Sequence, residues 1–437
     1  MRKCPGNRTM SYTTPPNNML GRLAASATYR LERTRQNPRE ILWMLHRSLP
    51  GVLNSSYRCY VRRANWRGSP CIKKVYRYAR EKDLRIGREQ LARELFADND
   101  WIVPILDSGD DWLVMPYFPQ RHRLDRAIGH MDDEAKAVAG DQILSILLDI
   151  HTAGYVHGDF HTKNLFWHES RVRVYDFDGF RPYLDGHRPP FADSYDVTGD
   201  RRGVEPNVLG LNNVPNRNIS LLGSRLGARL GLDRDIIAAR IRDSLTRQLV
   251  DQVANSTRQR TPGSFSLPHL SFPARLAGRD SAQRLAELGV GEAGPKGASL
   301  LDLGSEIGGL LFEAQNFAPG RCVGLEGDAA SVVLASRIAA FNGLNTVTFI
   351  DSTDRTAVAA GLAEPFDLVF CRLSSTSRDV AEPCGGLGRV TKRRLYIEGG
   401  EGCTAGELTR RLRDQGFSIA RHIGDSVGRP LFVAEKA

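Results

Sequence analysis

One short polar run constrains the fold of this chain more than any other feature. The run Tyr155–Asn164, Tyr-Val-His-Gly-Asp-Phe-His-Thr-Lys-Asn, places an Asp two residues after its first His and an Asn five residues after that Asp. A second acid, Asp176, follows in an apolar, strand-like stretch. An Asp at this spacing can orient the proton of an attacking hydroxyl, and carboxylate and amide oxygens suit Mg²⁺. The preceding segment, Asp141–His151, has a helical apolar stripe and is expected to end near Gly154.

The run resembles the catalytic loop of kinase-like phosphotransferases that act on sugars, lipopolysaccharide cores and small molecules. Their loop has the pattern His-Gly-Asp-x-His-x-x-Asn, and Gly158 and His161 follow it rather than the pattern of eukaryotic protein kinases. The later segment Asp-Phe-Asp departs from Asp-Phe-Gly at Asp178, and Gly179 follows one residue later. The resemblance therefore implies a phosphotransferase that acts on a sugar or another small molecule. A kinase that acts on a protein substrate is the alternative.

The resemblance also implies a role for each polar residue of the two loops. Asp159 is expected to accept the proton of the attacking hydroxyl, and His157 to brace the loop backbone. Asn164 and Asp176 are expected to hold the Mg²⁺ ions that bridge the phosphates of ATP.

Upstream residues supply candidates for the ATP-binding lobe of such an enzyme. The segment Ser69–Tyr76 predicts the strand whose Lys contacts the α- and β-phosphates, with Lys74 preferred and Lys73 as the alternative. The helical pattern that follows contains Glu89, which is expected to pair with that Lys, and Glu94 is the alternative.

Adenine is expected to lie against the strand-like segment that contains Met115 and Tyr117. No Gly-x-Gly-x-x-Gly occurs before Lys74, so Gly51–Tyr57 and Asn65–Gly68 are the candidates for a turn that covers the phosphates. Small backbone-donor turns can be built from Ser and Asn as well as Gly.

The second half of the chain carries a different pattern. Residues 299–305, which include Asp302 and Gly304, and then Gly308 predict a strand, a tight glycine turn and a helix start, and a second strand is predicted to end at Glu326. Glycines at such a turn let the backbone approach a ligand, and the acid can accept hydrogen bonds from ribose hydroxyls. Further strand-like segments end near Asp351, Arg372 and Glu398.

This half resembles class I S-adenosylmethionine-dependent methyltransferases over residues 273–437. Asp302, Gly304, Gly308 and Glu326 match the family's positions residue by residue, and Asp351 is expected near adenine, with Asp354 as the alternative. The resemblance implies S-adenosylmethionine as cofactor. A dinucleotide-binding site is the alternative, although the turn lacks the complete Gly-x-Gly-x-x-Gly.

Composition sets limits on location and partners. Residues 1–100 carry 21 Lys and Arg against 8 Asp and Glu, whereas residues 301–437 carry 15 against 17. The basic excess is either a solvated surface or a patch for an anionic membrane face or glycolipid, and nucleic acid is not expected. The sequence contains no apolar run of 18 residues and no recognisable signal peptide. Its seven Cys are scattered, as expected for a protein in a reducing cytoplasm. We therefore expect a cytoplasmic location, with the inner face of the cell membrane as the alternative. His151, His161 and His168 are interpreted as ordinary loop histidines.

We therefore expect two domains, one α+β and one α/β. The prediction is a disordered N-terminus at 1–20, a bilobal protein-kinase-like domain at 21–255, a linker at 256–272 and a Rossmann-like methyltransferase domain at 273–437. The predicted function is phosphorylation of a hydroxyl with ATP and Mg²⁺, on a sugar of a glycan or glycolipid, together with methylation, as in surface polysaccharide modification. The alternative is a protein or small-metabolite kinase with a methyltransferase-like regulatory or binding domain.

Overall fold

The computed structural model describes residues 49–55, 59–77, 81–160, 162–183, 186–191, 195–196, 218–219, 229–232, 234–255, 263–277, 280–290, 296–352, 361–362, 364–372, 386–399, 404–426 and 429–436. The predictions for residues 1–20 and 21–48, for His161 and for Asp354 lie outside this part of the chain. The chain divides into two units, residues 1–119 and residues 120–437, and each is described by itself.

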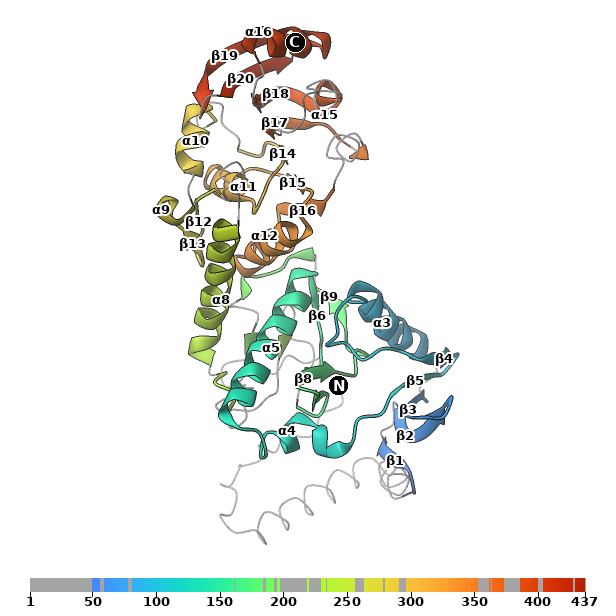
Figure 1. Cartoon of the computed structure of the whole chain (residues 1–437). Helices are drawn as coiled ribbons and strands as arrows, with labels where there is room; N and C mark the ends of the chain where they lie inside the picture. Colours follow the sequence, from blue (N-terminus) through green and yellow to red (C-terminus); the bar gives the residue numbers. More distant parts are fainter. Residues whose placement is uncertain are drawn as a thin grey trace, which may run out of the picture. The chain divides into compact units, whose positions relative to one another are not determined.

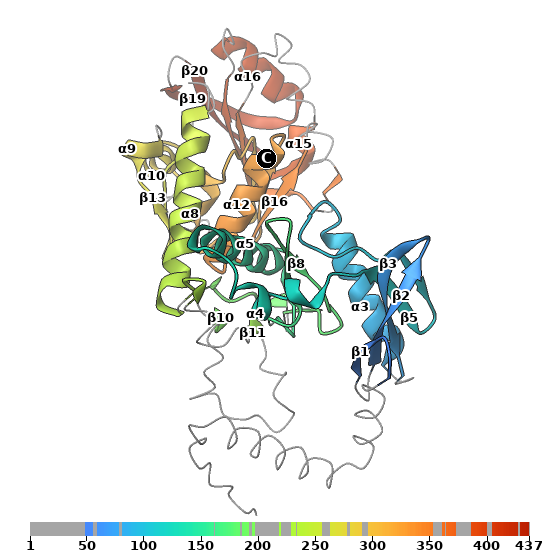
Figure 2. The same cartoon turned by 60° about the horizontal axis from the view of Figure 1, so that its bottom comes forward.

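The first unit is an antiparallel sheet with a helix beside it (Figure 2). The strand order is β1-β2-β3-β5-β4. The elements are β1 (Val52–Ser55), β2 (Cys59–Trp66), β3 (Ser69–Tyr76), α3 (Lys82–Leu95), β4 (Asp107–Gly109) and β5 (Trp112–Pro116). Arg67 and Gly68 join β2 to β3 with φ angles of 50° and 84°, as a two-residue hairpin turn requires.

Helix α3 is fixed to the sheet by an apolar contact and by charge. Ile86 packs against Tyr76 of β3 and Leu113 of β5. Glu89 and Ala92 lie on the same buried face. The segment predicted as a Lys-bearing strand is thus β3, and the helix predicted to carry its partner is α3.

The second unit begins with helix α5 (Asp133–Thr152), which leads into the polar run. The Asp132 side chain caps the helix by accepting a hydrogen bond from the Ala135 N–H at 2.8 Å. The helix stops before Gly154, whose φ of 83° a side chain would disfavour, so the predicted helix end is confirmed. Short elements surround it: η1 (Gln120–His122), α4 (Leu124–Ala127), β6 (Tyr155–Val156), β7 (Leu165–His168), β8 (Arg171–Val174), β9 (Arg181–Pro182), β10 (Tyr195–Asp196) and β11 (Asn218–Ile219).

A seven-stranded sheet forms the C-terminal part, with the order β16-β15-β14-β17-β18-β20-β19. The first five strands in this order are parallel, and β20 pairs antiparallel with both β18 and β19. The strands are β14 (Leu300–Leu303), β15 (Cys322–Glu326), β16 (Val347–Asp351), β17 (Phe366–Arg372), β18 (Thr391–Glu398), β19 (Phe417–Ser426) and β20 (Arg429–Lys436). This is the doubly wound α/β fold that the sequence predicts for this half.

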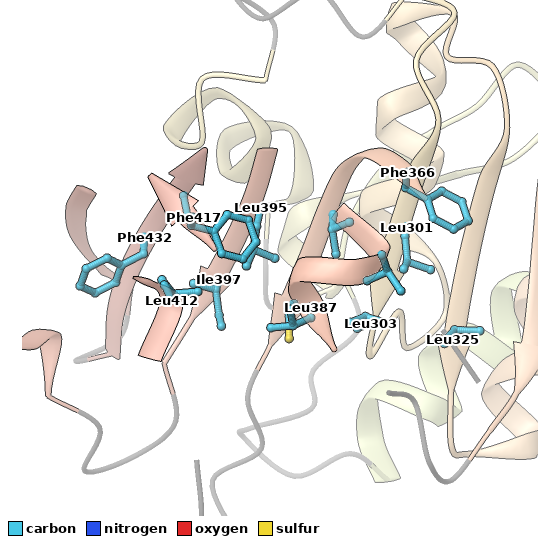
Figure 3. Close-up of a cluster of buried hydrophobic side chains, with 14 of the residues drawn as sticks. Leu301, Leu303, Leu325, Phe366, Leu387, Leu395, Ile397, Leu412, Phe417 and Phe432 are labelled. Atoms are coloured by element: carbon cyan, nitrogen blue, oxygen red, sulfur yellow. The ribbon is translucent and has the colours of Figure 1, made fainter. Parts of the chain in front are cut away.

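Helices fill the crossovers of this sheet and cover it. They are α10 (Ser281–Glu287), α11 (Gly309–Ala314), α12 (Ala329–Phe341), α15 (Leu387–Val390) and α16 (Ala405–Asp414), with η3 (Gln315–Phe317) after α11. Figure 3 shows side chains from β14, β17 and β18 in one cluster with Leu387 of α15 and Leu412 of α16. Continuous apolar strands buried on both faces are typical of parallel sheets.

The second part of the predicted linker at 256–272 contains regular secondary structure. Residues of this segment form a hairpin of β12 (Phe265–Ser266) and β13 (Ser271–Phe272), followed by α9 (Ala274–Ala277). Both Phe side chains of the hairpin are buried, and Phe265 lies edge-on to Phe312 of α11, with ring centroids 5.0 Å apart. The hairpin therefore belongs to the core around α11.

The chain also divides at Pro119 rather than within the predicted linker. Helix α8 (Arg234–Asn255), predicted as the last helix of the kinase-like domain, lies beside α5 and α12 (Figure 1). Gln252 of α8 donates to Asp328 and Ser331 at the start of α12. Arg337 of α12 forms an ion pair with Asp149 of α5 at 2.6 Å. These contacts join residues 120–255 to the seven-stranded sheet.

His151 is at the centre of this contact and is not a loop residue. It lies on the last turn of α5, fully buried, and donates from Nε2 to the carbonyl of Ala340 at 3.1 Å. Its Nδ1 accepts from the hydroxyl of Tyr183 at 2.6 Å. Arg188 binds carbonyls on both sides, those of Thr152 and Leu344. Burial lowers the pKa of His151 to about 3, helped by the charge of Arg188.

No helix among the described residues is long and apolar enough to cross a membrane.

Candidate active sites

The polar run after α5 brings an acid and an amide together. The side-chain amide of Asn164 donates to the carbonyl of Asp159 at 3.0 Å and lies 3.4 Å from its carboxylate. His157 is fully buried between Phe160 and Phe177, and its Nδ1 accepts from the N–H of Asp159 at 3.3 Å. The loop backbone is thereby held, and the carboxylate of Asp159 is oriented by its neighbours.

The second acidic segment lies against this loop. The N–H of Tyr175 donates to the carbonyl of Asn164 at 2.9 Å, which places Asp176 one residue from that bond. Asp176 has a φ of 65°, a left-handed conformation that costs a non-glycine residue free energy and is common at functional sites. A Cβ on Gly158 would lie 2.4 Å from the carbonyl oxygen of Gly179, so the close approach of the two loops excludes a side chain there.

In the first unit, Lys74 and Glu89 form a buried ion pair. The Nζ of Lys74 lies 2.8 Å from Oε1 of Glu89, and the two side chains are 4% and 0% exposed. The hydroxyl of Tyr76 donates to the same oxygen at 3.3 Å. A buried pair of this kind needs further hydrogen bonds to offset the loss of hydration, and this one has them.

The alternatives for these two roles lie elsewhere. Lys73 points to the opposite face of β3, where its Nζ lies 3.8 Å from the centre of the Trp112 ring. Glu94 is on the exposed side of α3. The geometry therefore favours Lys74 over Lys73 and Glu89 over Glu94 as the pair.

The two residues expected to contact adenine have different surroundings. Met115 is buried, and its Sδ lies 3.5 Å from a guanidinium nitrogen of Arg93. Tyr117 is half-buried, and its hydroxyl lies 2.5 Å from a guanidinium nitrogen of Arg63, which also lies over the ring. Tyr117 lines a pocket of the first unit together with Arg63, Ala64, Pro70, Cys71 and Pro119.

A second pocket opens at the carboxyl ends of the parallel strands. Its lining includes Asp302 in β14, Gly304 just after that strand, Arg372 at the end of β17 and Glu398 at the end of β18. Strand order reverses at β14, which has β15 on one side and β17 on the other. Ligands of open α/β sheets bind at such a switch point.

The glycine turn after β14 has the conformation that its sequence predicts. Gly304 and Gly308 have φ angles of 88° and 83°. A Cβ on Gly308 would lie 2.4 Å from the ring of Phe349. Between the two glycines, Glu306 takes a φ of 51°, and its N–H donates to the Glu326 carboxylate at 3.0 Å.

Glu326 is buried at the end of β15 and faces this turn. Its other carboxylate oxygen accepts from the N–H groups of Gly327 at 2.7 Å and Asp328 at 3.1 Å. The acid is thus held by backbone donors at the place where a ribose would lie in this type of fold.

Asp302 is buried below the turn, and its burial raises its pKa to about 6. The carboxylates of Glu306 and Glu326 raise the pKa further, while Arg372 and Arg284 lower it. The pocket thus holds a carboxyl group that is costly to ionise without a cationic partner.

Charged side chains that the sequence analysis did not select complete the pocket. Arg372 pairs with Glu306, and it lies 3.5 Å from Glu398. Glu398 also pairs with Arg284 of α10. A usable signal was present, because Arg372 and Glu398 are charged residues at the last positions of apolar strands.

Two buried hydroxyls of this region lack a hydrogen-bond partner among the described residues. They belong to Ser305, which follows Gly304, and Ser352, which follows Asp351. Asp351 itself is exposed, so the adjacent Ser352 is the more enclosed of the two. A buried hydroxyl without a partner costs free energy and indicates a ligand that would supply the bond.

These residues fit a nucleoside cofactor with a cationic end. Glu326 and the two serines offer bonds to hydroxyl and ring nitrogen atoms, and Asp302 offers a carboxylate to an ammonium group. For Mg²⁺, Asn164 and Asp176 carry side-chain oxygens of the kind that this ion prefers. Among the described residues, no group of three or more His, Cys, Asp or Glu could hold a metal ion by itself.

No family model matches the sequence, and no curated protein matches it. Solved structures that the chain is similar to are S-adenosylmethionine-dependent methyltransferases. Magnesium protoporphyrin IX methyltransferase from Synechocystis, with bound S-adenosylmethionine, is 19% identical over 36% of this chain and 78% of that chain, with a TM-score of 0.29.

Two more likenesses are of the same order. A methyltransferase from Aquifex aeolicus is 22% identical, with 38% and 92% of the two chains covered and a TM-score of 0.29. The N-terminal domain of EvdMO1, with S-adenosylhomocysteine bound, is 16% identical, with 45% and 97% covered and a TM-score of 0.34. At these scores the likenesses add nothing to what the strand order and the pocket show.

Proposed function

We propose that the pocket at the end of β14 binds S-adenosylmethionine and that the chain transfers its methyl group to an acceptor hydroxyl. The observation that carries this proposal is that Asp302 and the hydroxyl of Ser305, which has no partner among the described residues, line a pocket at the switch point. Glu326 lies at the end of the adjacent strand β15, and Ser352, whose hydroxyl is also unpartnered among the described residues, follows β16. A cationic nucleoside would neutralise the buried carboxyl groups and supply the missing hydrogen bonds.

The transfer itself needs little from the protein beyond placement. The acceptor oxygen attacks the methyl carbon, the carbon–sulfur bond breaks, S-adenosylhomocysteine leaves, and the acceptor proton passes to water or a nearby base. The carboxylates would hold the cationic reactant in place, and apolar side chains of the pocket lining, such as Phe370 and Leu288, would exclude bulk water.

We further propose that the chain transfers a phosphoryl group from ATP to a hydroxyl. The buried pair of Lys74 and Glu89 favours this second function, because a Lys held by an acid on an adjacent helix is the arrangement that positions nucleotide phosphates. In the second unit, Asp159 would orient the acceptor hydroxyl, and Asn164 and Asp176 would hold Mg²⁺.

The proposed acceptor for both reactions is a sugar hydroxyl of a glycan or glycolipid. The pattern His-Gly-Asp-x-His-x-x-Asn in the run Tyr155–Asn164 supports this choice over a protein substrate. The basic N-terminal third is compatible with a phosphorylated glycolipid at the inner face of a membrane. The competing proposal is a kinase whose methyltransferase-like part only binds its ligand.

Calorimetric titration of the full chain with S-adenosylmethionine, and separately with ATP and Mg²⁺, tests both functions. We expect both ligands to bind. Glu326→Ala should lose S-adenosylmethionine and retain ATP. Asp159→Ala should abolish phosphate transfer to water or to screened glycans and retain S-adenosylmethionine binding.

Each failure points to a different error. If the unmodified chain binds only one of the two ligands, the part of the chain proposed to bind the other ligand has no function in ligand binding. Phosphate transfer that survives in Asp159→Ala would show that the site is misassigned. Binding of S-adenosylmethionine without methyl transfer to any glycan would favour the regulatory alternative.

A further inference from the structure

Arg93 lies one helical turn after Glu89 on α3 and binds the same buried carboxylate. Its Nη1 lies 2.5 Å from Oε2 of Glu89, whereas Lys74 and Tyr76 bind Oε1. The two oxygens of one carboxylate are thus divided between two cations. The Arg93 side chain is 10% exposed, and that of Glu89 is fully buried.

The same guanidinium also ties α3 to the rest of the unit. Its Nε donates to the carbonyl of Val103 at 2.9 Å, and Nη1 donates to the carbonyl of Glu89 at 2.8 Å. Its Nη2 lies 3.5 Å from Sδ of Met115 on β5. One planar, five-donor group therefore fixes the helix, the segment after it and the central sheet in one arrangement.

We propose that Arg93 is a positioning residue for the proposed phosphoryl transfer: it holds Glu89, and through Glu89 it holds Lys74 where nucleotide phosphates would bind. This inference rests on the proposed phosphotransferase function. The inference adds that Arg93, on the same helix as Glu89, holds the Lys74–Glu89 pair in place before any ligand binds. No separate conformational change is then needed to bring α3 to the sheet.

The charge balance gives the physical reason. Lys74 and Arg93 bind different oxygens of Glu89, so binding to Arg93 draws part of the charge of this carboxylate away from Lys74. The ammonium group of Lys74 then keeps more of its positive charge for a polyanion such as a nucleoside triphosphate. With Arg93 removed, Glu89 would neutralise Lys74 more completely and would lose one of its two lateral supports.

The test uses the full chain and three Arg variants. Arg93→Met keeps the length of the side chain and removes its donors, and Arg93→Lys keeps the charge without the bonds to Val103. Arg85→Met is the control, because Arg85 on the same helix forms an ion pair with Glu81 four residues before it, at 2.7 Å, and the side chain of Glu81 is 43% exposed. Binding of ATP with Mg²⁺ is measured by calorimetry, and phosphate release to water gives KM and kcat.

We expect Arg93→Met to raise the KM for ATP about tenfold, with a smaller change in kcat. Arg93→Lys should recover part of the loss, and Arg85→Met should match the unmodified chain. In a Glu89→Gln background, Arg93→Met should add little, because the residue it acts through is already neutral. A purely structural role would lower the unfolding temperature and the active fraction but leave KM unchanged, and that result would overturn the proposal.

The proposed function fails in a different way. If the unmodified chain binds no ATP, the phosphotransferase function is wrong and the role of Arg93 falls with it. If the unmodified chain binds ATP, Glu89→Gln weakens binding and Arg93→Met does not, then the function stands and only the inference about Arg93 is wrong.

Discussion

The two units each bury a charged cluster, and the clusters have opposite excess charge. In the first unit, Lys74 and Arg93 share the single carboxylate of Glu89. In the second unit, the pocket is lined by the carboxyl groups of Asp280, Asp302, Glu306 and Glu398 and by the guanidinium groups of Arg284 and Arg372, and the charge of Glu326 also acts on Asp302. The first cluster suits a polyanion, and the second suits a ligand with positive charge.

The difference shows how burial separates two kinds of charged site. Glu89 has a cation within 3 Å of each of its oxygens, so its ionised form is compensated. Asp302 has carboxylates among its neighbours as well as cations, and its pKa rises to about 6. A buried carboxyl group whose charge is only partly compensated raises the free energy of the folded chain when it ionises. A cationic ligand that binds next to it would offset this cost.

The largest effect is expected for Lys74→Met. It removes the group proposed to contact phosphates, and Arg93 still neutralises Glu89, so the unit should fold. Phosphate transfer should fall about 100-fold. Binding of S-adenosylmethionine, measured by calorimetry, should not change. A loss of both activities would contradict the separation of the two clusters.

The next effect is expected for Asp302→Asn. Its affinity for S-adenosylmethionine should fall about tenfold, because a charged hydrogen bond is lost. Its stability should rise above that of the unmodified chain at pH 7.5. The folded pKa of Asp302 lies above its ordinary value of 3.8, so ionisation between about pH 4 and 6 destabilises the fold, and the neutral amide avoids this cost.

Thermal unfolding at pH 4.5 and pH 7.5 checks the Asp302 prediction. The stability gain of the variant should be large at pH 7.5 and shrink at pH 4.5. An equal gain at both pH values would show that packing, and not charge, is responsible.

A smaller effect is expected for His151→Leu, which should lower the free energy of unfolding by about 1 kcal/mol at pH 8. The variant removes hydrogen bonds to Ala340 and Tyr183 in the contact between α5 and α12. Because the folded pKa of His151 is about 3, below its ordinary 6.5, protonation favours the unfolded chain as the pH falls below 6.5. The stability gap between variant and unmodified chain should therefore narrow from pH 7 to pH 5 in urea unfolding. A gap that widens would refute the neutral, buried state of His151.

The smallest effect is expected for Lys73→Met, which serves as the partner of Lys74→Met. Lys73 lies over Trp112 on the other face of β3, so ATP affinity should stay within about twofold. Calorimetry with ATP and Mg²⁺ measures this directly. A loss as large as that of Lys74→Met would reverse the assignment of the two residues.

Local patterns in the sequence predicted much of the fold. The apolar stripe before Gly154 predicted the end of α5, and the glycine spacing after Asp302 predicted a tight turn, in which Gly304, Glu306 and Gly308 have positive φ angles. Both features depend on residues close together in the chain. The strands of the C-terminal sheet were predicted for the same reason, since buried parallel strands are continuous apolar runs.

Predictions from the sequence were inaccurate where contacts between residues far apart in the chain determine the structure. The segment 256–272 has the composition of a linker, but Phe265 and Phe272 are buried, and Phe265 packs against Phe312 of α11. His151 was assigned to a loop because its partners, Ala340 and Tyr183, are far away in sequence. Arg93 and Arg284 were not predicted as site residues, because the sequence around an Arg on a helix does not show which residues it will contact in the fold.

The sequence alone determined that β3 carries two adjacent Lys residues and that a helix with acids follows it. It could not determine which Lys meets which acid. Neighbouring side chains on a strand point to opposite faces, so the choice depends on which face of the sheet α3 covers. That face is set by the packing of Ile86 on Tyr76 and Leu113, and it brings Lys74 to Glu89 while Lys73 turns to Trp112.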